Sequence, residues 1–210
     1  KAARAARQPL DLDLPERKIV LDDKGKVASV NFRDRLDAHR LIEEFMVLAN
    51  VAAAETLIKK RQPLLFRVHE EPAQDKLDAL RDTAQAAGLN LAKGQVLQTR
   101  HLNALLNAAA GTDDAELINI STLRSMQQAV YQPANRGHFG LALERYMHFT
   151  SPIRRYADLV VHRAIKAVLH SKKPPYDGDK LAEIGSHISF TERRAEQAQS
   201  DAKSQLCQKI

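Results

Sequence analysis

Apolar residues recur at helical spacing along most of the chain. In residues 37–60 they return every three or four positions behind an acidic first turn that begins at Asp37, which is the pattern of an amphipathic helix. Gly88 and Gly111 follow two further segments of this kind and are typical helix stops. The pattern predicts helices over residues 37–60, 74–87, 99–110, 112–130, 152–169 and 179–206. Helix is therefore expected to dominate the fold.

Shorter segments carry a strand pattern. Two runs of strand-forming residues flank the sequence DDKG at residues 22–25, which predicts a β-hairpin within residues 18–32. Residues 62–70 are a second strand candidate. Residues 137–149 alternate in hydrophobicity and contain two glycines, which predicts a strand that another backbone or a ligand approaches closely. The expected fold class is α+β, helix-rich with a small mixed or antiparallel sheet.

The two ends of the sequence and its single cysteine bear on its organisation. Residues 1–17 are basic, then acidic and punctuated by proline, and are expected to be a linker or the start of a fragment, with the folded part over residues 18–210. A starting Met and a signal-peptide core are lacking, so we expect the middle of a longer chain. No apolar run is long enough for a transmembrane helix. The lone Cys207 excludes an internal disulfide and fits a reducing, cytoplasmic compartment.

The charge balance favours a polyanionic partner, although only weakly. Lys and Arg number 32 against 26 Asp and Glu, which gives a formal net charge of +6. Such an excess attracts nucleic acid through release of counterions, but many basic proteins bind none. Aromatic residues make up 5% of the chain and Trp is absent, which argues against a broad base-stacking platform. A bound strand would be held mainly by its backbone.

The start of the predicted helix 152–169 is a candidate phosphate site. Thr150 or Ser151 can serve as N-cap and Pro152 suits the first helical position. Arg154 and Arg155 then fall in the first turn, where the helix dipole disfavours cations. Helical projection puts Arg154 half-buried at the edge of the apolar stripe and Arg155 on the opposite side. Amides, hydroxyls and a guanidinium would converge there on one phosphate; alternatively, Arg154 pairs with Asp158 and Arg155 is solvated.

Two glutamates lie in a helical segment that is otherwise almost wholly apolar. Glu43, Glu44 and Asn50 are the only strongly polar residues of residues 41–54, so this helix is expected to be enclosed on most of its circumference. A buried carboxylate must find a donor, because an unpaired buried charge costs several kcal/mol. One possibility is a structural Glu–Arg pair. The other is acceptance of hydrogen bonds from ribose hydroxyls.

Several motifs in a fixed order resemble one family of nucleases. They are DAHRLIEEFMVLANVAAA, LFRVHEEP, LRSMQQAVYQPANRGHFGLALERYMHFTSPIRRYADLVVHRAI and TERRAEQA. Together they resemble the catalytic (RNB) domain of the ribonuclease II/ribonuclease R family, with the bacterial ribonuclease R branch as the nearer match. The resemblance covers about residues 16–206, and RGHFGLAL followed by HFTSPIRRYADL is highly specific in order and spacing.

The resemblance implies an activity and a set of site residues. Members hydrolyse RNA processively from the 3′ end to nucleoside monophosphates, with Mg²⁺ ions that activate water and stabilise the leaving oxygen. By motif, Arg154 matches the catalytic arginine that meets the scissile phosphate, and Glu43 matches the acidic residue that helps to hold the terminal nucleotide. Further RNA contacts are expected from Arg155, Tyr156, His138, Ser151 and Thr150. The resemblance implies the 3′ end of single-stranded RNA as partner, names the ribosome and RNA-decay factors as further candidates, and implies no membrane.

One element of the family pattern does not occur in these residues. The metal-binding aspartates of the family form a D-x-D-D-A type cluster upstream of the region that matches. The acidic pairs Asp11/Asp13, Asp22/Asp23 and Asp113/Asp114 lack its spacing and flanks, and Mg²⁺ needs several oxygen ligands in near-octahedral order. The cold-shock-like and S1-type domains are also absent. We therefore expect no metal ligands in this chain and no activity from it alone.

Two alternatives stay open. The chain could be a non-catalytic RNA-binding or interaction module that kept the channel wall and lost the metals. Apart from any resemblance, it could be a helical anion-binding protein that holds a free phosphate or an acidic partner at Arg154. Binding of an RNA oligomer in preference to inorganic phosphate would favour the RNA-binding module over the anion-binding protein.

Overall fold

Helices dominate the computed structural model, which describes residues 2–14, 17–23, 25–32, 36–93 and 97–207. The helices are α1 (Ala2–Arg7), α2 (Asp37–Lys59), α3 (Gln74–Ala86), α4 (Thr99–Ala109), α5 (Ala115–Ser125), α6 (Tyr156–Leu169) and α7 (Gly178–Cys207), with a short 3-10 helix at Phe139–Leu141. The strands are β1 (Arg17–Leu21), β2 (Val27–Phe32), β3 (Phe66–Val68) and β4 (Val130–Gln132). The strands form two separate two-stranded antiparallel sheets. The expected α+β, helix-rich class is confirmed.

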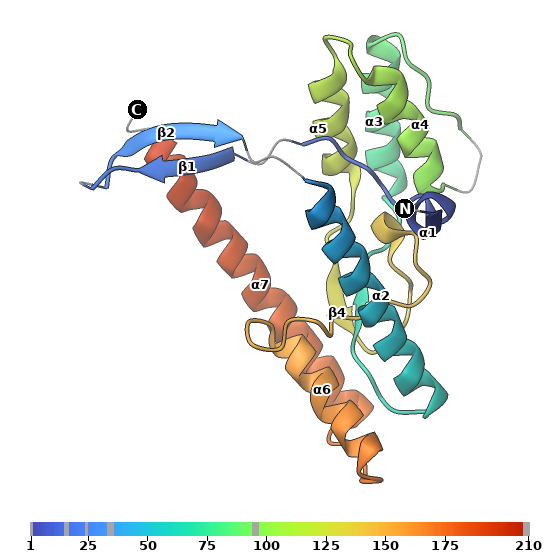
Figure 1. Ribbon diagram of the computed structural model, residues 1–210. Helices are drawn as coiled ribbons and strands as arrows, with labels where there is room; N and C mark the ends of the chain where they lie inside the picture. The colour runs from blue at the N-terminus through green and yellow to red at the C-terminus, as the bar shows by residue number, and fades with distance from the viewer. Residues whose placement is uncertain (1, 15–16, 24, 33–35, 94–96, 208–210) are drawn as a thin grey trace.

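The helices form two groups that α2 and the β3–β4 pair connect (Figure 1). At one end α3, α4 and α5 pack on a core of their own, made of Leu80, Ala84, Leu91, Leu102, Leu105, Leu106, Ala109 and Ile118. At the other end α6 packs on α2 and β3 through Ala53, Ala54, Leu57, Leu64, Phe66, Val68, Met147, Val161 and Ala164. The opposite side of α6 packs on α7 and β4 through Leu65, Tyr131, Ala157, Val160, Leu181, Ile184 and Ile188. Helix α6 thus lies between two cores.

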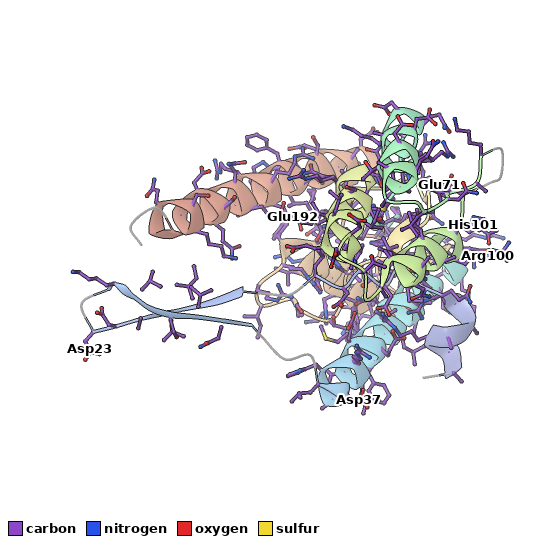
Figure 2. All side chains as sticks on the ribbon, turned by 90° about the horizontal axis from the view of Figure 1, so that it is seen from above. Asp23, Asp37, Glu71, Arg100, His101 and Glu192 are labelled. Atoms are coloured by element: carbon purple, nitrogen blue, oxygen red, sulfur yellow. The ribbon has the colours of Figure 1, made fainter. Side chains whose placement is uncertain are left out.

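The β1–β2 hairpin is where the sequence predicted one. Its turn closes through the Gly25 amide, which donates to the Asp22 carbonyl at 2.9 Å, and Gly25 has a φ of +72° that favours glycine. The Asp22 carboxylate accepts from the Lys26 amide at 2.8 Å. Both views show the hairpin extending away from α2 and from the group of α3, α4 and α5 (Figures 1 and 2).

The predicted strand over residues 137–149 is wrong. This segment contains the 3-10 helix and isolated bridges from His138 to His69 and Leu143. Its amides are satisfied across the fold: the Gly140 amide donates to Nδ1 of His69 at 3.0 Å, and the Phe139 amide donates to the His69 carbonyl at 2.7 Å. The strand that pairs with β3 is β4 instead, in a region expected to end a helix. Helix α5 correspondingly ends at Ser125 rather than near Val130.

The segment expected to be a linker is attached to the helices. It contains α1, and the side chains of Leu10 and Leu12 pack on the core of α3, α4 and α5. The Leu10 amide donates to the Gly140 carbonyl at 2.9 Å, and the Thr99 hydroxyl donates to the Gln8 carbonyl at 2.6 Å. These contacts fix the described residues 2–14 beside α4.

Among the described helices, none combines the length and the apolar character needed to cross a membrane.

Candidate functional site

The segment between Phe149 and Arg155 is a turn that precedes helix α6. The amides of Arg154 and Arg155 donate to the Ser151 carbonyl at 3.3 and 3.0 Å, and the helix begins at Tyr156 with Arg155 as N-cap. The predicted start at Pro152, with a Thr150 or Ser151 cap, is wrong. The reason is that Ser151 uses its carbonyl to close this turn and its amide to bond Asp158. We call residues 149–155 the arginine loop.

The burial of the two arginines is the reverse of what the sequence predicted. Arg155 is the half-buried one, and its Nε and Nη2 donate to the two carboxylate oxygens of Asp158 at 2.8 Å each. Arg154 is exposed. Burial of Arg155 acts to lower its pKa, but hydrogen bonds to Asp158 outweigh this and raise it. Asp158, which one alternative gave to Arg154, therefore belongs to Arg155, and the negative group beside Arg155 is a carboxylate of the chain itself.

Buried side chains hold three consecutive amides of the arginine loop. The Oδ1 atom of Asn50, on α2, accepts from the amides of Phe149 and Thr150 at 2.9 and 3.2 Å. The Oδ1 atom of Asp158 accepts from the Ser151 amide at 2.7 Å. Asn50 and Asp158 are 2% and 0% exposed. The sequence pointed to Asn50 only as a single carboxamide side chain within an apolar run, which did not indicate its role in the loop.

The Phe149 side of the arginine loop is also fixed, whereas its tip is open. The ring of His162 stacks on Phe149 with 4.4 Å between centroids, and its Nε2 donates to the Phe149 carbonyl at 2.9 Å. Ile153, next to Arg154, is fully exposed. The arginine loop therefore presents Ile153 and Arg154 to solvent from a backbone that is tied down on both sides.

His138 is half-buried and belongs to a cluster of aromatic and histidine rings. Its Nδ1 accepts from the Leu141 amide at 3.2 Å, and its ring contacts those of His69 and Tyr146 at centroid distances of 5.0 and 5.1 Å. Burial, with added repulsion from His69 and nearby cations, lowers the pKa of His138 to about 3. His138 is thus a neutral histidine at neutral pH. It reaches the loop through Tyr146, whose hydroxyl accepts from Asn50 at 2.9 Å.

His148 and Tyr131 complete this ring cluster. The Tyr131 hydroxyl lies 2.8 Å from Nδ1 of His148, at hydrogen-bonding distance. Burial and the charge of Arg155 lower the pKa of His148 to about 3, and burial raises the pKa of Tyr131 to about 12. The guanidinium of Arg67 lies over the Tyr131 ring at 4.5 Å. Both partners of the hydrogen bond are therefore uncharged at neutral pH.

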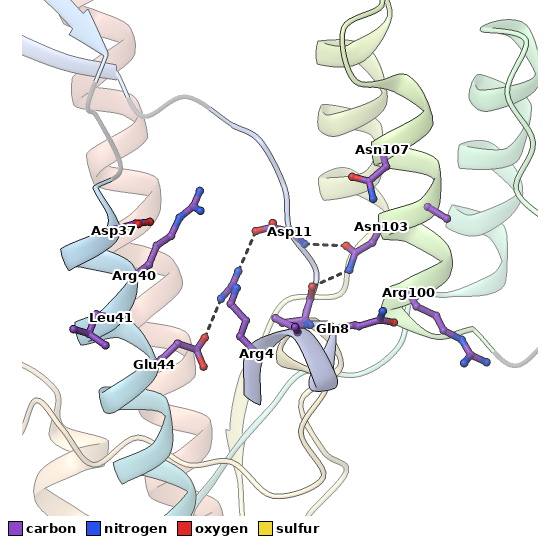
Figure 3. Close-up of a pocket in the computed structure, with 13 residues that line it drawn as sticks. Arg4, Gln8, Asp11, Asp37, Arg40, Leu41, Glu44, Arg100, Asn103 and Asn107 are labelled. Atoms are coloured by element: carbon purple, nitrogen blue, oxygen red, sulfur yellow. Dashed lines mark hydrogen bonds and ion pairs between the residues drawn. The ribbon is translucent and has the colours of Figure 1, made fainter. Parts of the chain in front are cut away.

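Glu44 forms the Glu–Arg pair that the sequence allowed for either glutamate of α2. It accepts from Arg4 at 3.0 Å and from Arg7 at 3.2 Å, and Figure 3 shows Arg4 lying between Glu44 and Asp11. Burial acts to raise the pKa of Glu44, but the hydrogen bonds from Arg4 and Arg7 outweigh it and lower the pKa. Glu43 is half-buried one position earlier.

The expectation that α2 is enclosed on most of its circumference is wrong. Four large apolar side chains of its first half are between 57% and 63% exposed: Leu41, Ile42, Phe45 and Leu48. Only the second half of the helix is packed, because β3 and α6 cover it there and not further toward its start.

Two cavities lie near the predicted residues. One, of about 790 Å³, is lined by residues of α1, α2 and α4, among them Arg40 and Glu44 (Figure 3). The other, of about 640 Å³, is lined in part by His138, Arg100 and Arg136. Arg154 lines neither cavity. The structure thus brings Thr150, Ser151, Arg154, Arg155 and Tyr156 together on the arginine loop and the first residue of α6, and leaves Glu43 and His138 at other surfaces.

The acidic groups that the structure describes do not fit a magnesium site. In that part of the chain, no three His, Cys, Asp or Glu side chains are arranged to hold a metal ion. Asp11 is paired with Arg4 at 3.0 Å, and Asp22 accepts from the backbone of its own turn. Such carboxylates do not supply the convergent oxygen ligands that Mg²⁺ requires.

Comparison with known proteins identifies relatives of this arrangement. Ribonuclease R of Escherichia coli is 40% identical over 95% of this chain, which covers 26% of that protein. Mycoplasma genitalium RNase R in complex with ribose-methylated single-stranded RNA superposes with a TM-score of 0.88 at 29% identity, over 98% of this chain and 33% of that one. Yeast Ssd1, described as a pseudonuclease, gives a TM-score of 0.69 at 31% identity, over 79% of this chain and 21% of that one.

The chain therefore spans about a quarter of the length of the curated relatives that it matches. The model of the RNB domain matches residues 1–171. Because this model matches most of the sequence, the chain belongs to the RNB-domain family.

Proposed function

We propose that these residues are part of an exoribonuclease that hydrolyses single-stranded or structured RNA processively from its 3′ end to nucleoside monophosphates. The observation that carries the proposal is the exposed Arg154 on a loop whose backbone is held by buried Asn50 and Asp158. A cation carried on a fixed backbone can meet a phosphate without rearrangement of the loop, which favours stabilisation of a developing charge. The membership of the RNB-domain family supplies the reaction class.

The proposed roles follow the geometry of the site. Arg154 meets the scissile phosphate, because its guanidinium faces solvent, pairs with no carboxylate among the described residues, and leaves Asp158 to Arg155. Arg155 supports the arginine loop through Asp158 and adds positive charge beside the strand. The half-buried Glu43 accepts from the hydroxyls of the terminal ribose. Thr150, Ser151, Tyr156 and His138 are proposed as further channel contacts.

The proposal includes a division of labour within a longer catalytic domain. Residues 18–210 would form its C-terminal part, and the aspartates that hold Mg²⁺ would belong to another segment. When bound, Mg²⁺ would supply an activated water and charge neutralisation at the phosphate. The residues of this chain bind and orient the RNA backbone. We place the protein in the cytoplasm, with RNA 3′ ends as its substrate and with the ribosome or RNA-decay factors as further partners.

Hydrolysis of a 5′-labelled single-stranded RNA by the full natural chain that contains these residues tests the proposal. With Mg²⁺ we expect release of nucleoside monophosphates from the 3′ end, and no release with EDTA or from DNA of the same sequence. The 210 residues alone are expected to bind the RNA without hydrolysing it. Displacement of this RNA by an equal concentration of inorganic phosphate would contradict the channel and favour a simple anion site.

A second candidate function is a non-catalytic RNA-binding module. It is favoured by the absence of a metal-binding cluster among the described residues and by the likeness to a pseudonuclease. The same assay distinguishes the two. Tight binding of the RNA oligomer by the full natural chain, with no monophosphate released at any Mg²⁺ concentration, would support this second function and overturn the first.

A further inference from the structure

We propose that Asn50 is a positioning residue for the reaction: its side-chain amide, from α2, sets the backbone of the arginine loop and thereby the place of Arg154. This inference rests on the proposed function, since it concerns the same phosphate contact. It assigns a role to a residue that never touches the substrate.

All the hydrogen-bonding atoms of the Asn50 side chain are used within the fold. It is 2% exposed, and Oδ1 accepts from the amides of both Phe149 and Thr150. Its Nδ2 donates to the Tyr146 hydroxyl at 2.9 Å. Loss of this side chain would leave the two amides without an acceptor, and a buried unsatisfied donor is costly. The arginine loop would then have a strong reason to move.

Asn50 and Asp158 bond adjacent amides of the arginine loop from two different helices. Asn50 bonds residues 149 and 150 from α2, and Asp158 bonds Ser151 from α6. The start of the arginine loop therefore connects the two helices and cannot shift without breaking one of these bonds. Arg154 lies three residues further on, and its own amide is tied back to the Ser151 carbonyl. A displaced Ser151 carries Arg154 with it.

The arginine loop depends on one atom of the Asn50 side chain, its acceptor Oδ1. An acceptor at the position of Oδ1 serves the arginine loop, whereas the donor Nδ2 serves only Tyr146. Aspartate at position 50 keeps the acceptor, and the Tyr146 hydroxyl can turn to donate to it. Alanine keeps neither group. Asn50→Asp and Asn50→Ala therefore separate the role in the loop from the mere presence of a polar residue.

The chain offers a matched control in Asn119 on α5. Asn119 is 7% exposed, and it also uses both ends of its amide: Oδ1 accepts from the Asp13 amide at 2.8 Å and Nδ2 donates to the Ala115 carbonyl at 2.9 Å. It lies in the group of α3, α4 and α5, away from the arginine loop. Asn119→Ala removes the same atoms from an equally buried site.

The experiment measures kcat, KM and thermal stability of the full natural chain and its variants on single-stranded RNA. Asn50→Ala is expected to lower kcat about 10²-fold, since a displacement near 1 Å can cost that much, while KM changes less than about threefold. Asn50→Asp should recover most of kcat. Asn119→Ala should lose stability to a similar degree and keep kcat. If Asn50→Ala does not fold, Asn50→Ser, which keeps one weaker acceptor, is expected to show an intermediate kcat.

Hydrogen exchange gives a readout that does not depend on activity. In Asn50→Ala the amides of residues 149 and 150 should exchange faster, whereas in Asn119→Ala they should match the parent. An active parent whose Asn50→Ala and Asn50→Ser variants keep its kcat would overturn this inference alone. A parent that hydrolyses no RNA would overturn the proposed function, and the inference would fall with it.

Discussion

Asp158 and Arg155 form a bidentate ion pair in which the carboxylate is completely buried and lies three residues after the arginine. The same carboxylate accepts from the Ser151 amide at 2.7 Å. One side chain thus neutralises the half-buried guanidinium, closes the arginine loop and places negative charge in the first turn of α6, where the helix dipole favours it.

The first prediction follows because Arg155 and the Ser151 amide share the Asp158 carboxylate as acceptor. Asp158→Ala leaves a half-buried guanidinium and a loop amide without their acceptor, and breaking a buried pair in this way costs about 3–5 kcal/mol. Asp158→Asn should cost less, because its Oδ1 can still accept from one of the donors. Urea unfolding of the 210-residue chain measures both. A loss below about 1 kcal/mol in Asp158→Ala would mean that the pair is solvated and dispensable.

The two arginines show where interpretation of the sequence reached its limit. The sequence indicated that cations in a first helical turn need a negative partner, and Asp158 was one of the candidates. One of its two alternatives paired Asp158 with Arg154, because the projection at 100° per residue assumed a helix from Pro152. The helix begins at Tyr156, so the projection does not apply to Arg154. The turn that displaces the start depends on Asn50, which is about a hundred residues away.

The second prediction concerns acid. Burial lowers the pKa of both His138 and His148 from 6.5 to about 3, so the unfolded chain takes up these protons and the folded chain does not. Stability is therefore unaffected by them above about pH 6.5 and falls as the pH drops from there toward 3. Each histidine contributes about 1.4 kcal/mol per pH unit in that window.

Unfolding curves between pH 6.5 and 4 measure this slope. His148→Asn keeps an acceptor for the Tyr131 hydroxyl and removes the titrating ring, so the slope should fall by about 1.4 kcal/mol per pH unit. His170→Asn, at an exposed position, is the control and should match the parent. Equal slopes in the parent and in His148→Asn would show that His148 is not the group that resists protonation.

Patterns in the sequence predicted correctly the elements whose hydrogen bonds join residues close together in the chain. The hairpin of β1 and β2, with its turn at Gly25, and the helix α2 follow from nearby residues and appear as predicted. The segment 137–149 does not, because its amides bond to His69, about seventy residues earlier. The open face of α2 was missed for a similar reason: an apolar stripe predicts that a helix face can be covered and does not say what covers it.

The third prediction concerns the contact between α7 and β4. A Cβ atom built on Gly185 would lie 2.5 Å from the Tyr131 carbonyl oxygen, which is backbone and cannot move aside. Gly185→Ala should therefore force α7 away from β4 and cost about 1–3 kcal/mol. Gly178 begins the same helix with nothing within 4 Å of such a Cβ, so Gly178→Ala is the control and should be neutral within about 0.5 kcal/mol. Because alanine has the higher helix propensity, a Gly185→Ala variant that is as stable as the parent, or more stable, would show that this contact is not tight.

The last prediction separates the two arginines by function. Arg154 is exposed, so Arg154→Ala should leave stability within about 0.5 kcal/mol of the parent. In the full natural chain it should lower kcat for RNA about 10²–10⁴-fold, because one donor to the transition-state charge is lost, while RNA binding weakens only modestly. Arg155→Ala should instead lower stability, because Asp158 stays buried without its partner. Single-turnover hydrolysis, RNA binding and urea unfolding of both variants give the comparison. Near-parental turnover in Arg154→Ala, with its stability intact, would remove Arg154 from the chemistry and leave the arginine loop as a structural turn.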